Sequence, residues 1–161
     1  MTTAIDPTPD QPVHKTITVQ ASPERAFQVF TGGIDTWWPR THHIGQSAMT
    51  KTVIECYAGG RCYSEQADGT ECVWGSILAW EPPHRFVMAW QIDQQWKYQP
   101  DPAQSSEVEV RFTPEEGGAT RVDLEHRHFN RLGAGADTMR TAVASPMGWA
   151  GLLRGFAVQV D

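Results

Sequence analysis

The order of apolar and polar positions predicts that the chain begins with a strand and then a helix. Residues 13–20 alternate between apolar and polar side chains, which is typical of a half-buried strand. Ser22 can cap a helix whose first residue is Pro23, because the missing N–H of proline costs nothing there. An apolar stripe runs on to Phe30, and Gly32-Gly33 then end the helix.

A second, shorter helical turn is predicted over residues 34–38. Pro39 ends it, because the residue before a proline avoids the helical region of backbone space. Trp37 and Trp38 are adjacent and cannot face the same way. We therefore expect one of them in the core and the other at a cavity.

The middle of the chain reads as a series of strands joined by turns that are rich in Gly, Pro and Asp. Connections this short cannot join parallel strands, which need a crossover of about a dozen residues or more. An antiparallel meander is therefore predicted, with strands over residues 50–57, 61–66, 71–81, 84–92, 107–113 and 120–129.

The alternation breaks within residues 74–80. Trp74, Leu78 and Trp80 would share one face of a regular strand, while Ile77 and Ala79 would occupy the other. A β-bulge, which adds one unpaired residue to a strand, would resolve the conflict.

Two segments outside the predicted strands bear on a binding site. Residues 93–106 form the longest loop, and Trp96 and Tyr98 make it the candidate lid. In residues 134–160, apolar side chains recur at helical spacing from Trp149 onward, so a long amphipathic helix is predicted. Pro146 either opens this helix or kinks it.

Length and composition predict one globular domain over residues 13–161 after a disordered, polar tail over residues 1–12. The tail lacks the features of a signal peptide, and the longest apolar runs are too short to span a bilayer. A net charge of -6 without a basic cluster argues against nucleic acid and anionic membranes as partners. Three cysteines without metal-type spacing fit a reducing compartment, so we expect a cytoplasmic protein.

Several sequence stretches, in this order and spacing, resemble one known family. They are Ser22-Pro23-Glu24-Arg25-Ala26-Phe27 with Trp37-Trp38, residues 75–86 leading to Trp90, residues 108–114, residues 118–126, and Gly148-Trp149 before Leu152-Leu153. Together they resemble the branch of the SRPBCC (START-like) superfamily that contains homologues of the activator of heat-shock protein ATPase.

The resemblance implies an α+β helix-grip fold like that of the birch-pollen allergen. A curved antiparallel sheet of about six or seven strands would wrap around the long C-terminal helix, with two short helices after the first strand. Members of the superfamily include co-chaperone domains, ligand carriers and enzymes, so the fold alone does not determine the function. The activators carry a separate N-terminal domain that this sequence lacks, which weakens the co-chaperone interpretation.

Two histidines are the main candidates for chemistry. In residues 121–129 the alternation places His126 and His128 on the face that carries Val122 and Leu124, toward the interior. There an imidazole could bind an acid or carry a proton near neutral pH. In the alternative interpretation, His126 donates to a backbone carbonyl and His128 ends the strand in solvent.

No catalytic residue, cofactor or metal site is assigned from the sequence. It contains no nucleophile elbow, no phosphate-binding loop and no pair of carboxylates on one face. A His-x-His pair needs further ligands, and none has diagnostic spacing. We expect His42-His43 to lie in a solvated loop.

The leading hypothesis is a protein that binds a small apolar or amphipathic molecule between the sheet and the C-terminal helix. Two alternatives stay open: an enzyme such as a cyclase, hydrolase or isomerase with His126 or His128 as acid or base, and a module that regulates a chaperone ATPase. A homodimer is a further open point. The candidate ligand-binding residues are Trp38, Trp90, Phe112, His126, His128, Met147 and Trp149.

Overall fold

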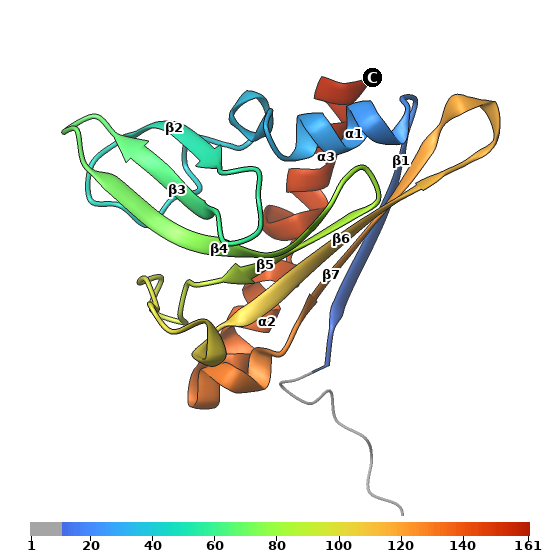
Figure 1. Cartoon of the computed structure of the whole chain (residues 1–161). Helices are drawn as coiled ribbons and strands as arrows, with labels where there is room; N and C mark the ends of the chain where they lie inside the picture. Colours follow the sequence, from blue (N-terminus) through green and yellow to red (C-terminus); the bar gives the residue numbers. More distant parts are fainter. Residues whose placement is uncertain (1–10) are drawn as a thin grey trace, which may run out of the picture.

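The computed structural model describes residues 11–161, so nearly all of the predicted tail over residues 1–12 lies outside the described residues. Seven antiparallel strands form one sheet in the order β1-β7-β6-β5-β4-β3-β2. The sheet is strongly bent, and its inner face wraps around the C-terminal helix (Figure 1). The strands are β1 (Val13–Val19), β2 (Met49–Ile54), β3 (Arg61–Gln66), β4 (Glu71–Glu81), β5 (Arg85–Trp90), β6 (Ser106–Pro114) and β7 (Thr120–Arg127).

The first helix and the short turn after it lie where the sequence pattern places them. Helix α1 (Pro23–Phe30) is capped by Ser22, whose hydroxyl oxygen accepts a hydrogen bond of 3.2 Å from the backbone N–H of Arg25. A 3-10 turn (Ile34–Thr36) follows. Helices α2 (Ala136–Ala144) and α3 (Gly151–Val160) form the C-terminal segment, and α3 crosses the inner face of the sheet (Figure 1). The predicted helix-grip fold is confirmed.

The C-terminal helical segment is divided in two. Between α2 and α3 lies a wide turn (Pro146–Ala150), in which Gly148 has non-helical backbone angles of φ -91° and ψ -135°. A Cβ atom at Gly148 would lie 2.3 Å from the carbonyl oxygen of Val143, so only glycine fits there. The single long helix predicted over residues 134–160 is therefore interrupted, at the proline that was expected to open or kink it.

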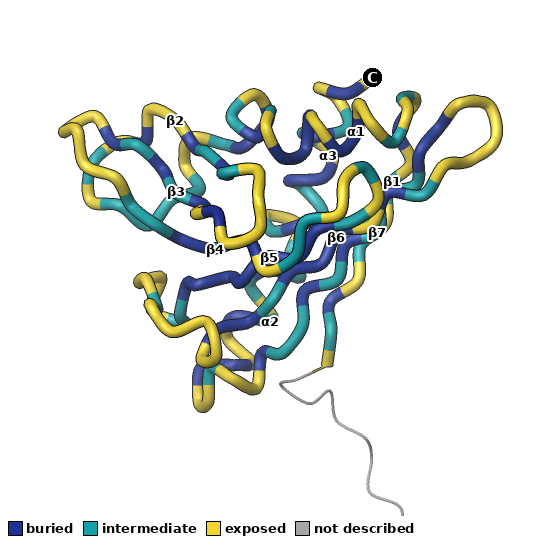
Figure 2. Tube along the Cα trace, in the orientation of Figure 1, coloured by how far each residue is buried: buried dark blue, intermediate teal, exposed yellow. Residues whose placement is uncertain are grey.

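Aromatic rings fill one end of the space between sheet and helices. Phe30 lies at the centre, with ring centroids 5.0 Å from Trp37, 5.6 Å from Phe86 and 4.9 Å from Phe156. The indole N–H of Trp37 donates to the carbonyl of Val29 at 2.9 Å, so this buried ring leaves no polar atom unpaired. The buried stretches of the chain follow the inner face of the sheet and the helices packed on it (Figure 2).

Strand β4 contains the predicted bulge. Its register against β5 shifts between Ile77 and Ala79, so Leu78 has no partner and its side chain is exposed. A second shift, against β3, leaves Trp74 between the paired residues Val73 and Gly75. The two irregularities allow Trp74 and Ile77 both to be buried although they are three residues apart.

The outer face of the sheet carries a network of charges. Glu109 on β6 forms ion pairs with Arg85, with Arg111 at 3.1 Å and with Arg127 at 3.1 Å. Burial by itself would raise the pKa of Glu109, but the hydrogen bond from Arg85 and the charges of Arg111 and Arg127 hold it below its usual value. The network accounts for the polar half of the alternation in β6.

Candidate functional site

A cavity of about 400 Å³ lies between the inner face of the sheet and the turn that joins α2 to α3. Such a volume is within the range of small-molecule sites, about 300–1,000 Å³. Its walls come from four segments that are distant in the sequence. The lining residues are Trp38, Thr41, His42, His43, Ile44, Trp74, Trp90, Ile92, Trp96, Ala142, Val143, Ser145, Met147, Gly148, Trp149 and Leu152.

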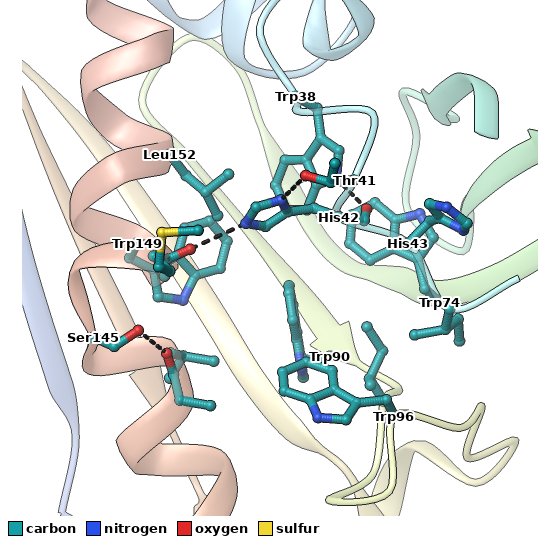
Figure 3. Close-up of a pocket in the computed structure, with 16 residues that line it drawn as sticks. Trp38, Thr41, His42, His43, Trp74, Trp90, Trp96, Ser145, Trp149 and Leu152 are labelled. Carbon is teal, nitrogen blue, oxygen red and sulfur yellow. Dashed lines mark hydrogen bonds between the residues drawn. The ribbon is translucent and has the colours of Figure 1, made fainter. Parts of the chain in front are cut away.

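Tryptophan rings form most of the cavity wall (Figure 3). Trp38 stacks on Trp74 with centroids 5.4 Å apart and planes 16° from parallel. Trp90 meets Trp74 at 5.8 Å and Trp149 at 5.5 Å, both edge to face. Because these rings hold one another at fixed angles, the wall is built before any ligand enters.

Trp37 and Trp38 divide as predicted. Both rings are buried in the core, but only Trp38 also lines the cavity. The indole N–H of Trp38 donates to the carbonyl of His42 at 2.8 Å, which ties the following loop to the cavity wall.

The expectation that His42 and His43 lie in a solvated loop is wrong. Both are partly buried and line the cavity, and their rings point to opposite sides (Figure 3). His42 Nε2 lies 3.0 Å from the carbonyl oxygen of Met147, and its Nδ1 lies 3.1 Å from the Thr41 hydroxyl. Since only a protonated nitrogen can donate to a carbonyl, Nε2 carries the proton and Nδ1 accepts from Thr41. His42 thus joins the loop before β2 to the turn before α3.

His126 lies behind the cavity wall and is fully buried. Its Nδ1 accepts a hydrogen bond of 3.0 Å from the Trp149 indole N–H, so its Nε2 carries the proton and donates to the Ser106 hydroxyl at 2.8 Å. Burial lowers the pKa of His126 to about 3, and the ring is therefore neutral at physiological pH. Both nitrogens are engaged, and the ring orients Trp149 without lining the cavity.

His128 does not follow His126 onto the inner face, and that prediction is wrong. Strand β7 ends at Arg127, and His128 has a left-handed backbone with φ 65°. Its side chain is 44% exposed and lies 3.8 Å from Glu107, whose side chain belongs to the charged outer face. A strand alternation holds only while the backbone stays extended.

Some of the remaining candidate residues line the cavity, and others lie outside its lining. Trp90, Met147 and Trp149 line the cavity, whereas Phe112 packs against Phe27 at 5.1 Å in the aromatic core. Of the two candidate lid residues, Trp96 lines the cavity. Tyr98 instead pairs with Ile92 through an isolated β-bridge at the base of the loop.

Trp96 has an uncommon backbone conformation, with φ 61°. A bulky residue adopts positive φ only where its surroundings impose it. Here the Asp93 carboxylate accepts hydrogen bonds from the backbone N–H groups of Gln95 at 2.9 Å and Lys97 at 3.0 Å. These bonds close the turn around Trp96 and direct its ring toward the cavity, with 48% of the residue still exposed.

The cavity lining carries no permanently charged side chain. It contains no Asp, Glu, Lys or Arg, and its polar side chains are Thr41, His42, His43 and Ser145. Within residues 11–161 no three side chains of the metal-binding types cluster. The arrangement is suited to holding an uncharged, mainly apolar molecule.

Comparison with known proteins places the chain in a family. Residues 20–158 match the family model described as Activator of Hsp90 ATPase homolog 1-like protein. The chain belongs to this family. Its members share the helix-grip fold of the SRPBCC superfamily with polyketide cyclase-like proteins.

Two solved structures are similar over nearly the whole chain. An anthrahydroquino-γ-pyrone synthase, Txn09, is 39% identical, with 96% of this chain and 99% of that chain covered and a TM-score of 0.65. A self-sacrificing resistance protein, CalC, from Micromonospora echinospora is 29% identical, with 96% of each chain covered and a TM-score of 0.66.

A third solved structure supports the fold alone: NE0264 from Nitrosomonas europaea is 12% identical, covers 98% of this chain and 97% of that chain, and has a TM-score of 0.66. No curated protein matches the chain. Within residues 11–161, no helix is long and apolar enough to cross a membrane.

Proposed function

We propose that the protein binds a small, uncharged and largely aromatic molecule in the cavity between the sheet and the α2–α3 turn. The observation that carries the proposal is the wall itself. Five of its residues are tryptophans, namely Trp38, Trp74, Trp90, Trp96 and Trp149, and none is charged. Flat aromatic molecules gain both apolar burial and favourable ring geometry against such a wall.

The comparisons support the same chemistry. The 39% identical relative is named as a synthase of an anthrahydroquino-γ-pyrone, a fused and oxygenated aromatic compound. Its match covers 96% of this chain. A multi-ring aromatic ligand is therefore our proposal for this chain.

Trp96 and Met147 are the lid in this proposal. Both line the cavity while 48% and 75% of each residue is exposed, so they lie where the cavity meets solvent. A ligand that enters would bury the Trp96 ring, and the Asp93 turn holds that ring in place beforehand. The conformational entropy lost on closure is correspondingly small.

Tryptophan fluorescence tests the proposal, because the sensors are in the wall. Dihydroxyanthraquinone titrated into the protein should quench the emission with saturation at one ligand per chain. A variant with Ala142→Phe puts a ring into the cavity and should weaken binding at least tenfold. Thr141→Phe, at the neighbouring exposed position of α2, is the matched control and should bind as the wild type does. Equal binding by both variants, or none by the wild type, would refute the proposal.

A second candidate function is chemistry on the bound molecule, favoured by the imidazole of His42 in the cavity wall and by the synthase name of the relative. His126 is fully buried behind the cavity wall and does not line the cavity, and the side chain of His128 lies beside Glu107 of the outer face. His42→Gln would abolish turnover of a bound substrate while leaving its affinity within a few-fold. Unchanged turnover would exclude His42 as the acid or base.

Three further predictions stay open. One is that residues 13–161 form a single domain in the cytoplasm, which limited proteolysis and cell fractionation would test. Another is a homodimer, which sedimentation would test.

The last is a chaperone partner, suggested by the family description. An ATPase assay with the purified chaperone would detect regulation as a changed turnover.

A further inference from the structure

Three hydrogen bonds fix the position of His42 at the cavity. Its backbone carbonyl accepts from the Trp38 indole N–H at 2.8 Å. Its ring lies between the Met147 carbonyl oxygen, 3.0 Å from Nε2, and the Thr41 hydroxyl, 3.1 Å from Nδ1 (Figure 3). All four residues line the cavity. The imidazole therefore has one orientation, and neither of its nitrogens is left to contact a ligand directly.

The hydrogen bonds around this ring run in one direction. With the proton on Nε2, His42 donates to the Met147 carbonyl, and its Nδ1 accepts the proton of the Thr41 hydroxyl. The Thr41 oxygen thus uses its only proton within the protein and keeps free lone pairs. Hydrogen bonds in such a chain strengthen one another, so this oxygen is a better acceptor than that of an isolated hydroxyl. A proton that passes between His42 and a ligand would have to cross Thr41.

The free end of this chain of bonds lies at the mouth of the cavity. Thr41 is exposed and lines the cavity, as does Met147, which is 75% exposed. A ligand that fills the cavity would exclude water from the Thr41 oxygen. Because a buried acceptor without a donor costs free energy, the ligand that fits best supplies a proton at this point.

The other polar groups of the wall are less selective. The indole N–H groups can only donate, so they bind a ligand oxygen whether or not it carries a proton. Ser145 also directs its proton into the protein, to the carbonyl of Ala142 at 2.7 Å, but through one bond rather than a chain of two. Thr41 is therefore the stronger acceptor of the two hydroxyl groups in the wall.

We propose that Thr41 determines the ligand specificity of the cavity by accepting a hydrogen bond from a hydroxyl group on the aromatic ring of the ligand, and that His42 is its positioning residue. The inference rests on the proposed function, since the rings of the same ligand would lie against the tryptophan wall. It narrows the ligand class to phenols, in preference to aromatic ethers and hydrocarbons of similar shape.

Three probes with the same ring system test this by calorimetric titration: β-naphthol, its methyl ether and naphthalene. The ether has the oxygen but not the proton, so the ratio of naphthol affinity to ether affinity reports the donated bond. Thr41→Val, which keeps the shape of threonine without the hydroxyl, should lower this ratio about two- to tenfold, the usual value of one neutral hydrogen bond. Its affinity for naphthalene should be unchanged. Thr41→Ser keeps the hydroxyl and should keep the ratio.

Two further variants separate the role of His42 from a general effect of losing a hydroxyl. His42→Ala removes the acceptor of the Thr41 proton, which can then turn to the ether oxygen, so the ratio should fall here too. Thr50→Val is the matched control, because Thr50 is exposed, lies outside the cavity lining and donates to the Glu65 carbonyl at 3.1 Å. Its ratio should equal that of the wild type.

An unchanged ratio in Thr41→Val would overturn the proposal, even if all three affinities fell together, because the hydroxyl would then only hold the loop. A ratio that falls as far in Thr41→Ser would overturn it as well. A fall in Ser145→Ala without one in Thr41→Val would assign the contact to Ser145 instead, and an unchanged ratio in His42→Ala would refute the positioning role. If the wild type binds none of the probes, the proposed function itself has failed.

Discussion

Two sets of buried polar side chains differ in one respect. Around β7, His126 uses both ring nitrogens, one with the Ser106 hydroxyl and one with the Trp149 indole. Around β3, Ser64 and Gln66 are equally well buried but each leaves an atom unpaired. The first set is complete within the fold and so serves stability. The second leaves polar atoms unpaired among the described residues, and each such atom costs about 1–3 kcal/mol.

Trp149 belongs to the first set, as the donor to His126, and its loss should have the largest effect. Trp149→Ala should lower the free energy of unfolding by about 3–5 kcal/mol, because a fully buried aromatic side chain is removed and Nδ1 of His126 loses its donor. Denaturant unfolding measures this. Trp149→Phe keeps most of the buried ring and should cost clearly less. A loss under about 1 kcal/mol for the alanine variant would mean that α3 is anchored elsewhere.

The pH dependence of stability tests whether the His126 set is structural. An unfolded imidazole titrates near 6.5, and burial lowers the pKa of folded His126 to about 3. Between these values only the unfolded chain binds the proton, so the free energy of unfolding falls with falling pH by up to about 1.4 kcal/mol per pH unit. This contribution is complete above pH 6.5.

Unfolding curves between pH 7 and pH 5 would show the effect apart from most carboxylate titration. His126→Gln should flatten the dependence by one proton. An equally steep curve for His126→Gln would show that another group is responsible.

The bond between His42 and Met147 contributes at the edge of the cavity. His42→Ala should lower the free energy of unfolding by about 0.5–1.5 kcal/mol, the usual net value of one hydrogen bond. His84→Ala at an exposed turn is the control, expected within about 0.5 kcal/mol of the wild type. If the two variants are equally stable, the loop before β2 is not held by His42.

Trp96 should have the smallest effect on stability and a clear effect on binding. Trp96→Gly releases a backbone that glycine adopts freely, so the free energy of unfolding should stay within about 1 kcal/mol of the wild type. Affinity for dihydroxyanthraquinone should nevertheless fall several-fold. Tyr98→Ala in the same loop, outside the cavity lining, is the comparison variant. Equal affinities for the two variants would exclude Trp96 as the lid.

Most of the fold follows from local sequence signals. The Ser22 cap, the turns between strands and the bulge near Leu78 each depend on residues within one element. The separation of Trp37 from Trp38 was likewise expected from their adjacency in a short turn. These features could be predicted because neighbouring residues determine them.

The site could be predicted only in part, because it depends on contacts between distant segments. Four cavity tryptophans were candidates from composition and position alone, namely Trp38, Trp90, Trp149 and Trp96. His42 gave no local signal, since its partner Met147 is 105 residues away. The place of His128 depended on where β7 ends, and alternation does not reveal that.

The glycine and proline that divide the C-terminal segment separate two tasks along one stretch of chain. After the break, Phe156 packs in the core, with only Leu152 of α3 also reaching the cavity wall, and before it, Ala142 and Val143 form part of that wall. Side chains of a different size could therefore be exchanged in α2 with little consequence for the grip of α3. The break makes the capacity of the cavity an independently adjustable property, open to divergence among relatives and to redesign.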